Sequence, residues 1–268
     1  MKAIVISASS DIGTALAKDW SENGWEVFGT YRTYSKAVES LETNFNVRLV
    51  HCDLLDKNSI QNACENLVHQ CSFWDALIIA PGHLEPIGDF KDLDFDEWEK
   101  SIQINLLQQL RILHQLLPYR NLSTKQEPCV LFFAGGGTNN AVLHYSSYTL
   151  SKIALIKMCE LLDAEIPDTR FVIVGPGVVK TKIHEPTLRL GKRAAGDNYK
   201  RTVQRLENNE CTDMDDVIKC CTYLITTPCK NVRGRNFSVV SDKWDTRELE
   251  QELAADQNMY KLRRHKNT

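Results

Sequence analysis

The sequence predicts an α/β fold: a single domain built on a doubly wound parallel sheet, with helices on both faces and a C-terminal helical extension. Short β-rich runs alternate with longer helical patterns along most of the 268 residues, as in a series of βαβ units. Most of these runs are apolar on both faces, which is typical of central strands in a covered parallel sheet. No internal repeat, low-complexity tract or linker rich in Pro, Gly or Ser divides the chain.

Seven segments have the composition expected of the strands. They are Ala3–Ser7, Glu26–Tyr31, Val47–Cys52, Ala76–Ala80, Cys129–Ala134, Arg170–Val174 and Asn236–Val240. A sheet of this kind has right-handed crossovers and binds its ligands at the carboxyl ends of its strands.

The clearest helical pattern covers Trp98–Leu117, where apolar residues recur at helix spacing. Asp94 and Glu97 predict a capping box at its start, and Pro118 is expected to end it.

Two segments fall outside the alternation of strands and helices. Lys182–Arg205 is polar and has the character of a loop. Trp244–Thr268 has the pattern of an amphipathic helix, with Leu249, Leu253 and Tyr260 on one side and a basic end at Lys261–Lys266.

The composition excludes several classes of protein. With 32 basic and 35 acidic residues the formal net charge is −3, so the molecule lacks the positive field that non-specific nucleic-acid binding requires. The apolar run at the N-terminus is too short for a signal peptide, and no segment reaches the ~20 apolar residues of a membrane span. Nine cysteines occur at scattered spacings without a CxxC pair. We therefore expect free thiols in a reducing, cytoplasmic environment, with no metal site and no membrane contact.

Small residues form the turn after the first predicted strand, from Ser7 to Gly13. Such a turn lets the backbone approach a pyrophosphate at the positive N-terminus of the next helix. Only Gly13 remains of the three glycines expected there, so a plain strand-to-helix turn is an equal alternative. Arg32 follows the second strand, where an NAD-binding protein would place an acid for the ribose 2′-hydroxyl. Its guanidinium could bind a 2′-phosphate, and the competing interpretation is a solvated surface arginine.

A tyrosine and a lysine stand four residues apart, at Tyr148 and Lys152, at the start of a helical pattern. Residues at this spacing lie on the same face of a helix. A cation near a phenol favours the phenolate, and it is expected to lower the tyrosine pKa toward the working pH of a general acid or base.

In the order and spacing of these features the sequence resembles the short-chain dehydrogenase/reductase family, from Lys2 to about Trp244. The family's TGxxxGxG turn is similar to Ile6–Gly13, and its adenine-contacting acid resembles Asp53, followed by Leu54. The NNAG element is similar to residues 79–82, which end in Ala80-Pro81-Gly82. The PGxxxT motif is intact at residues 176–181, and Asn105 matches the helix asparagine.

The resemblance implies a Rossmann-like domain that transfers a hydride between a nicotinamide cofactor and a carbonyl/alcohol pair. Tyr148 would protonate the carbonyl oxygen, Lys152 would lower the tyrosine pKa and hold the nicotinamide ribose, and Asn105 would position a water in the proton relay. Tyr31 occupies the position of the NAD-specifying acid and Arg32 matches the arginine of NADP-preferring members, so NADP is expected rather than NAD. The residues expected to bind the cofactor are Ser7, Ser9, Ser10, Asp11, Ile12, Gly13, Tyr31, Arg32, Asp53, Leu54, Ala80, Pro81, Gly82, Tyr148, Lys152, Pro176, Gly177, Val179 and Thr181.

The sequence departs from the family pattern at the serine that polarises the substrate oxygen. Gly135 stands thirteen residues before Tyr148, where that serine is expected, and its neighbour is Ala134. Loss of such a donor usually costs orders of magnitude in rate. Thr138 is our first choice as a substitute catalytic hydroxyl. Ser146 and Ser147 are alternatives, although both also suit a helix N-cap.

Asp11 replaces a glycine of the first turn, and we expect it to cap the following helix, because its charge would oppose a pyrophosphate unless it points away. Alanine and proline replace the paired asparagines at Ala80 and Pro81. These departures leave open a degraded site in a non-catalytic relative.

Charge is unevenly distributed along the chain. The segment Lys182–Arg205 has seven basic residues against Glu185 and Asp197, whereas residues 85–99 hold seven acids and one lysine. In the family the first of these segments folds over the substrate, which predicts a substrate lid at residues 182–212 within a catalytic domain of residues 1–243, followed by the extension 244–268. A basic lid would suit a phosphorylated or carboxylated substrate, and a solvated surface helix is the alternative.

We therefore predict an NADP-dependent oxidoreductase acting on a small polar substrate, sugar-like or anionic. The resemblance also implies a homodimer or homotetramer formed through the helices that carry Asn105 and Tyr148. Two alternatives remain: a cofactor-binding regulatory or structural relative without turnover, and an epimerase or dehydratase that uses nicotinamide without net redox change.

Overall fold

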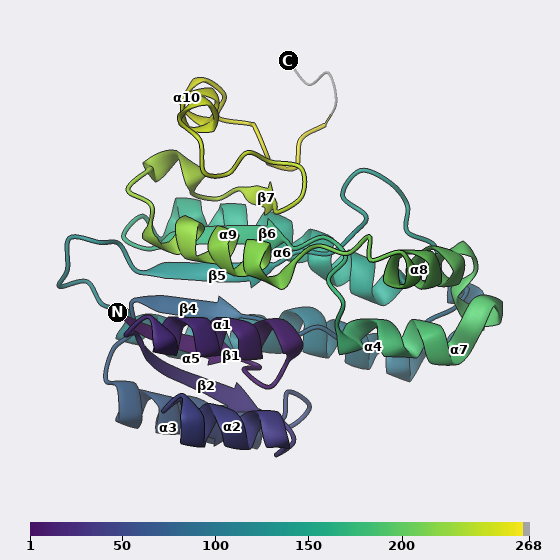
Figure 1. The fold of residues 1–268 in the computed structure, drawn as a ribbon, viewed down its shortest axis with the longest axis horizontal. Helices are drawn as coiled ribbons and strands as arrows, with labels where there is room; N and C mark the ends of the chain where they lie inside the picture. Colours follow the sequence, from purple (N-terminus) through teal and green to yellow (C-terminus); the bar gives the residue numbers. More distant parts are fainter. Residues whose placement is uncertain (265–268) are drawn as a thin grey trace.

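A computed structural model describes residues 1–264 of the chain. Its centre is a seven-stranded sheet in the order β3-β2-β1-β4-β5-β6-β7, and every neighbouring pair is parallel (Figure 1). This confirms the predicted fold class. The strands are β1 (Lys2–Ile6), β2 (Glu26–Tyr31), β3 (Arg48–His51), β4 (Ala76–Ile79), β5 (Cys129–Phe133), β6 (Arg170–Gly175) and β7 (Asn236–Ser238).

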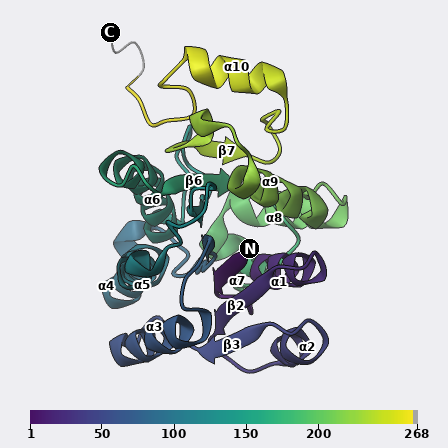
Figure 2. The ribbon, with the colours of Figure 1, turned by 90° about the vertical axis from the view of Figure 1, so that its left-hand side faces the viewer.

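Helices cover both faces of the sheet, as Figure 2 shows edge-on. One face carries α1 (Asp11–Glu22), α2 (Lys36–Asn44) and α9 (Met214–Thr226); the other carries α3 (Lys57–Cys71), α4 (Phe95–Ile102), α5 (Gln108–Leu116) and α6 (Ser146–Glu165). Short 3-10 turns occur at Phe90–Asp92, Leu117–Tyr119, Lys182–His184 and Lys230–Val232. No helix within residues 1–264 is both long and apolar enough to cross a lipid bilayer.

Side-chain alternation along β1 explains the two-layered core. Ala3 and Val5 belong to one buried cluster with Trp20 of α1, whereas Ile4 and Ile6 belong to the cluster on the opposite face. Because successive strand residues point to opposite faces, an apolar strand with no polar alternation is stable only when both faces are covered.

The predicted helix at Trp98–Leu117 is present but differs in detail. Asp94 caps α4, accepting hydrogen bonds from the amides of Asp96 and Glu97 at 2.9 and 3.2 Å. The helix begins three residues earlier than expected, and a π-helical turn, Gln103–Leu107, separates α4 from α5. Periodicity did not reveal this turn, since one extra residue per turn barely disturbs an apolar pattern.

The loop-like character predicted for Lys182–Arg205 is wrong, whereas the alternative interpretation as a helix agrees with the structure. The segment folds into α7 (Glu185–Ala195) and α8 (Asp197–Glu207), which pack at the carboxyl ends of the strands. Pro186 stands in the first turn of α7, where proline favours helix initiation. Ala195 and Tyr199 pack on Ile87 and Tyr145, so a small satellite core stabilises helices that the polar composition concealed.

The predicted terminal helix is also shorter than expected. Helix α10 spans Arg247–Ala255 and buries Leu249 and Leu253 as predicted, but Tyr260 lies beyond its end. The buried Arg235 donates to the carbonyls of Leu253, Asp256 and Met259 at 2.6 to 3.0 Å, which folds the chain back along β7. The last part of the predicted basic end, from residue 265 on, lies outside the described residues.

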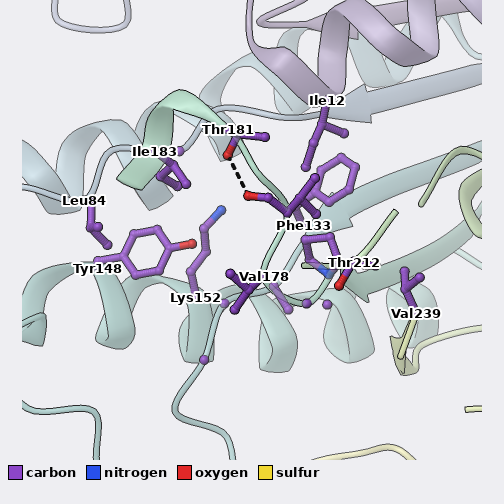
Figure 3. Close-up of a pocket in the computed structure, with 18 of the residues that line it drawn as sticks. Ile12, Leu84, Phe133, Tyr148, Lys152, Val178, Thr181, Ile183, Thr212 and Val239 are labelled. Carbon is purple, nitrogen blue, oxygen red and sulfur yellow. Dashed lines mark hydrogen bonds between the residues drawn. The ribbon is translucent and has the colours of Figure 1, made fainter. Parts of the chain in front are cut away.

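A cavity lies at the carboxyl ends of β4, β5 and β6 (Figure 3).

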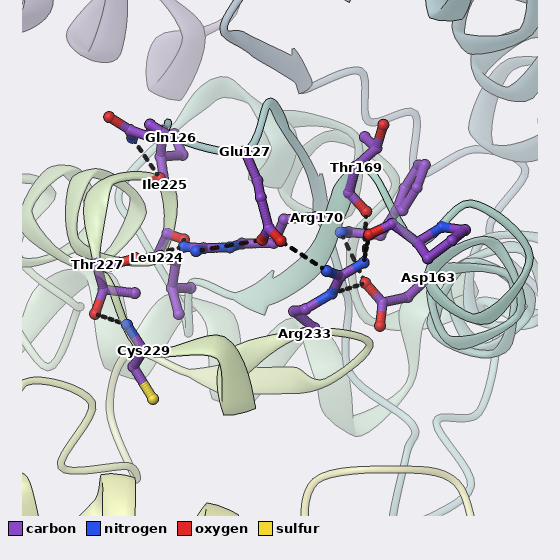
Figure 4. Close-up of polar contacts among 12 residues, drawn as sticks. Gln126, Glu127, Asp163, Thr169, Arg170, Leu224, Ile225, Thr227, Cys229 and Arg233 are labelled. Carbon is purple, nitrogen blue, oxygen red and sulfur yellow. Dashed lines mark hydrogen bonds and ion pairs between the residues drawn. The ribbon is translucent and has the colours of Figure 1, made fainter. Parts of the chain in front are cut away.

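At the opposite, amino-terminal end of β6 a partly buried polar network joins this strand to its neighbours (Figure 4). Arg233 donates to Asp163 at 3.0 Å, to Glu127 at 3.1 Å and to two backbone carbonyls. Arg170 donates to the carbonyls of Leu224 and Thr227 at the end of α9. These contacts connect α6, β6 and α9 behind the cavity.

The network predicts a large stability effect for Arg233→Met. Removal of the guanidinium leaves Asp163, whose pKa is already raised by burial, without its cation, and we expect the free energy of unfolding to fall by about 2–4 kcal/mol. Chemical denaturation measures this loss. Lys219→Met is the matched control, because its 4.0 Å pair with Asp216 is exposed. Equal losses in the two variants would contradict the account.

Candidate active site

An open cavity of about 1780 Å³ lies at the carboxyl ends of the strands. Residues at or just after the ends of all seven strands, from α6 and from the segment 181–213 line its wall. A single drug-sized ligand needs roughly 300–1,000 Å³, so the volume suits two ligands side by side. The position agrees with the rule that open parallel sheets bind ligands at this edge.

Tyr148 and Lys152 lie on the first two turns of α6 and both line the cavity (Figure 3). Their spacing brings the two side chains together, with Lys152 Nζ 5.8 Å from the centroid of the Tyr148 ring. Lys152 is 1% exposed, and its ammonium donates to the carbonyl oxygen of Pro81 at 3.3 Å. The lysine forms no ion pair with a carboxylate of residues 1–264, and burial is the cause of its lowered pKa, about 8.

The expected lowering of the tyrosine pKa is not found. Burial raises the pKa of Tyr148 to about 12, because a half-enclosed phenolate loses hydration that the ammonium, directed at Pro81, does not replace. Tyr148 is therefore held as a protonated phenol. A protonated phenol is suited to donating a proton.

Asn105 is fully buried in the π-helical turn and does not reach the cavity wall. Its side chain donates to the carbonyl of His83 at 2.7 Å and accepts from the amide of His83 at 2.8 Å. A further bond joins it to Ser101 at 3.1 Å. The side chain thus fixes the loop after β4 to the helix, and both of its polar ends are occupied.

The packing around Gly135 explains why a glycine stands where the family serine is expected before Tyr148. A Cβ atom at this position would lie 2.7 Å from Tyr148 Cε1 and 3.0 Å from Lys152 Cγ. Contacts below 3.0 Å require a shift, so the glycine lets the tyrosine ring pack directly on the backbone of this loop. Thr138 lines the cavity but is exposed, and no hydrogen bond to another residue within 1–264 holds its hydroxyl. Ser146 and Ser147 do not cap α6, whose N-cap is Tyr145; Ser146 accepts from the Trp98 indole instead.

The turn after β1 has the close-packed geometry of a phosphate-binding turn. Ser7 adopts φ of 66°, a left-handed conformation that glycine usually supplies, and its amide donates to the Thr30 hydroxyl at 2.8 Å. A Cβ on Gly13 would lie 2.3 Å from the carbonyl oxygen of Ser7, so glycine is required there. Ser7, Ser9, Ser10, Asp11 and Ile12 line the cavity, whereas Gly13 lies behind them.

The prediction that Asp11 caps α1 is wrong. Ser10 is the cap and accepts from the Gly13 amide at 3.1 Å. Asp11 accepts from the backbone amide of Lys182 at 2.7 Å and lies 3.9 Å from its ammonium. The carboxylate therefore ties the turn to the segment that enters α7, a contact between residues that are far apart in the sequence.

The residues predicted for the adenosine end divide into two groups. Arg32, Asp53 and Leu54 line the cavity, and Arg32 is exposed. Tyr31 does not line it, because its ring packs edge-on against Tyr34 and His51. The end of β2 thus presents a cation and no carboxylate.

Residues Ala80, Pro81, Gly82, Pro176, Gly177, Val179 and Thr181 all line the cavity. The loop after β6 is held by the Thr212 amide, which donates to the carbonyl of Val178 at 2.8 Å, and Thr181 donates to the carbonyl of Val179 at 3.3 Å. The predicted cofactor residues therefore converge on one cleft, except Gly13 and Tyr31.

Sequence reasoning missed several residues of the cavity wall. Leu84 and Ile183 flank Tyr148 in Figure 3, and Phe133, Val178, Thr212 and Val239 continue the wall. Phe133 is the last residue of β5 and Ile183 lies in a 3-10 turn, whereas the others come from loops. Their positions at the cavity depend on tertiary packing, so no local pattern marks them. Tyr260, Lys261 and Leu262 also reach the cavity, because the chain folds back after α10.

The fold and this cleft define a class: an α/β oxidoreductase with a dinucleotide-type turn at one end of its cavity and a tyrosine–lysine pair at the other. A comparison with family models matches residues 1–189 to the short chain dehydrogenase model. The chain belongs to the short-chain dehydrogenase/reductase family, whose members bind NAD(P), and it is a dehydrogenase/reductase enzyme.

Relatives and solved structures agree with this family. The chain is 23% identical over 243 residues to human dehydrogenase/reductase SDR family member 2, mitochondrial, covering 88% of this chain and 84% of the relative. A short chain dehydrogenase/reductase from Saccharomyces cerevisiae has a TM-score of 0.81 at 21% identity, covering 91% of this chain and 98% of that one. A variant of actinorhodin polyketide ketoreductase with NADPH has a TM-score of 0.76 at 20% identity, covering 89% and 95% of the two chains.

The geometry at Gly135 predicts that restoring the family serine harms this enzyme. In Gly135→Ser the new Cβ displaces the Tyr148 ring, and a misplacement near 1 Å can cost about 100-fold in rate, so we expect kcat to fall at least about tenfold. Steady-state kinetics measures the change. Gly136→Ser is the matched control, since its Cβ would meet only Val142 at 3.7 Å. Higher turnover in Gly135→Ser than in the parent would contradict this account.

Proposed function

We propose that the enzyme is an NADP-dependent reductase that transfers a hydride to a carbonyl group of a small substrate, or removes it from the corresponding alcohol. The observation that carries the proposal is the placement of the Tyr148 and Lys152 side chains in the same cleft as the turn after β1 and Arg32. The cofactor would supply the hydride. All other steps rest on side chains of this chain.

Tyr148 is the proton donor. Its phenol is protonated because burial raises its pKa to about 12, and it lies beside the cavity where a carbonyl oxygen would gain negative charge. Lys152 places a positive charge behind the ring, which stabilises the tyrosinate that forms as the proton leaves. Leu84 and Ile183 lie beside the ring and make its surroundings apolar.

Arg32 supports NADP over NAD. It is the cation at the end of β2, it lines the cavity, and it forms no ion pair with a carboxylate within residues 1–264. A guanidinium in that position binds a 2′-phosphate with two parallel hydrogen bonds. The NADPH named in the ketoreductase structure agrees with this choice but belongs to that protein.

The predicted lid at residues 182–212, which contains α7 and α8, supports a polar or anionic end on the substrate. Of its seven basic residues, Lys182, Arg201 and Arg205 line the cavity, and Glu210, Asp213 and Asp216 lie in the same wall. The mixed charges at this rim contrast with the apolar surroundings of Tyr148. We therefore propose a carbonyl compound with an apolar group beside the carbonyl and a polar, sugar-like or anionic end at Arg201.

Direct contacts of α7 and α8 with neighbouring loops and with the N-cap of α6 hold the lid at the cavity. The Tyr145 hydroxyl bonds the Thr187 hydroxyl at 2.8 Å, and Asn198 donates to the carbonyl of Leu143 at 2.8 Å. Arg189 pairs with Glu85 at 2.7 Å, so the basic and acidic segments of the chain meet here.

A homo-oligomer and a cytoplasmic location complete the proposal. Leu150 and Leu161, three turns apart on α6, and Leu107 of the neighbouring π-helical turn are about half exposed, which supports association of two copies through these helices. The nine unpaired cysteines support a reducing compartment.

Two alternatives differ in what the enzyme does with its cofactor. A regulatory relative would bind NADPH without turnover, and an epimerase or dehydratase would convert substrate without consuming NADPH. The glycine at position 135 favours the first, whereas the protonated Tyr148 beside a buried lysine favours reduction.

Removal of the Tyr148 hydroxyl tests the proposed role of the phenol. In Tyr148→Phe the proton donor is absent, and we expect kcat with a panel of ketones and aldehydes to fall at least about 100-fold, while NADPH binding is retained. Absorbance of NADPH follows the reaction. Tyr119→Phe, a half-exposed tyrosine outside the cavity, serves as the control. Unchanged turnover in Tyr148→Phe would exclude this mechanism.

Substitution of Arg32 tests the choice of cofactor. A charge-assisted contact is worth about 1.5–3 kcal/mol, so Arg32→Ala should raise the dissociation constant for NADPH about 10- to 100-fold and leave that for NADH unchanged. Fluorescence titration gives both constants. Arg48→Ala, on β3 and outside the cavity, is expected to change neither. A parallel loss of NADPH and NADH affinity would assign Arg32 a structural role.

A further inference from the structure

The lysine of the active site is a buried cation with few partners. Its ammonium has three N–H groups, and the Pro81 carbonyl, at 3.3 Å, is the one hydrogen-bond acceptor found for it among residues 1–264. Tyr148 on the same helix is the titratable group beside it, and no charged group of the described chain contributes to its pKa shift. An ammonium in this situation needs further acceptors to remain charged.

Gln109 lies directly behind the same carbonyl and is fully buried. Its Nε2 donates to the Pro81 oxygen at 3.1 Å and to the Ile104 oxygen, in the π-helical turn, also at 3.1 Å. Lys152 and Gln109 therefore converge on one oxygen atom, from α6 and α5 respectively. Gln109 thereby fixes the loop after β4 to the start of α5, close to the Lys152 ammonium.

The other end of the Gln109 amide is an acceptor without a donor. Gln109 Oε1 is buried and makes no hydrogen bond within the described chain. A buried acceptor that lacks a partner is energetically unfavourable, so a fully buried amide of this kind requires a reason. The amide cannot be reversed, because both neighbouring partners are carbonyl oxygens and need the Nε2 donor.

We propose that Gln109 is a positioning residue for Lys152: it fixes the Pro81 carbonyl that receives the ammonium, and its Oε1 is a second acceptor, reached directly or through one water. The Lys152 ammonium and the Gln109 Nε2 both donate to the Pro81 carbonyl. The lysine has further N–H donors and Gln109 Oε1 lacks a donor, so the two groups complement each other. This inference rests on the proposed function only for its predicted effect on kcat. The predicted effect on the pKa of Lys152 does not depend on turnover.

The test measures the titration of Lys152 itself. Protein with 13Cε-labelled lysine is titrated by NMR from pH 6 to 11, and the Lys152 signal is identified by its loss in Lys152→Met. In Gln109→Leu the ammonium loses an acceptor, so we expect its midpoint to fall about one pH unit below that of the parent, which the structure places at about 8. In Gln109→Glu the added carboxylate should raise the midpoint by about one unit or more.

Gln108→Leu is the matched control. Gln108 is also buried, but its side chain bonds to Gln103 and Arg111 on the outer side of the helix, so the Lys152 midpoint should not change. If Gln109→Leu fails to fold, Gln109→Glu decides the question alone. A midpoint that is unchanged in the Gln109 variants, even with lower thermal stability, would overturn the inference and leave Gln109 a structural residue.

The kinetic consequence separates this inference from the proposed function. If Lys152 stabilises the tyrosinate, kcat in Gln109→Leu should fall about tenfold with little change in KM for the carbonyl substrate. Unchanged turnover in Tyr148→Phe would refute the proposed function. The NMR titration of Lys152 would still decide the role of Gln109. Normal kcat together with a shifted midpoint would refute the kinetic link alone.

Discussion

The proposed mechanism depends on keeping the ammonium of Lys152 charged inside the protein, although no carboxylate of residues 1–264 pairs with it. The side chain is 1% exposed, and the backbone carbonyl of Pro81 is its hydrogen-bond acceptor. Burial opposes the charge and lowers the lysine pKa to about 8, so a modest number of neutral acceptors has to balance a large loss of hydration. A carboxylate would hold the charge more firmly, but it would also weaken the positive field that the proposed mechanism assigns to the neighbouring phenol.

Several features of the fold serve this arrangement. The parallel sheet brings the ends of β4 and β5 next to the first turns of α6, so the Pro81 carbonyl, Gly135 and Tyr148 lie side by side. Asn105 clamps the loop after β4 through both backbone groups of His83, and Gln109 holds the carbonyl of Pro81 from behind. Because Gly135 has no side chain, the Tyr148 ring can pack directly against the backbone at this position. These elements, far apart in sequence, act as one packed unit.

Local patterns predicted most of this fold. Apolar strands without polar alternation indicated a covered parallel sheet, and the seven strands lie within two residues of their predicted bounds. Periodicity and motif order also placed Tyr148 and Lys152 together, since residues four apart share a helix face. The segment that forms α7 and α8 looked like a loop, with a surface helix only as the alternative, because its few apolar residues pack on a small satellite core that composition does not reveal.

Non-local contacts account for what the sequence did not predict at the site. Asp11 was expected to cap its own helix, but it bonds to Lys182, which only the closed fold brings near it. The direction of the Tyr148 pKa was predicted wrongly because spacing gives proximity to a cation but not the extent of burial, which dominates here. Tyr260 was placed on a helix, although the buried Arg235 draws the chain into a turn before it.

The central claim is that this cleft moves a hydride between cofactor and carbonyl and that the reaction has net redox change. The most direct measurement uses NADPH deuterated at the transferable C4 position, with mass spectrometry of the product formed from a carbonyl substrate. The account predicts one deuterium on the carbinol carbon and one NADPH consumed for each product molecule. Product that carries no deuterium while NADPH is unchanged would contradict it and would indicate an epimerase or dehydratase instead.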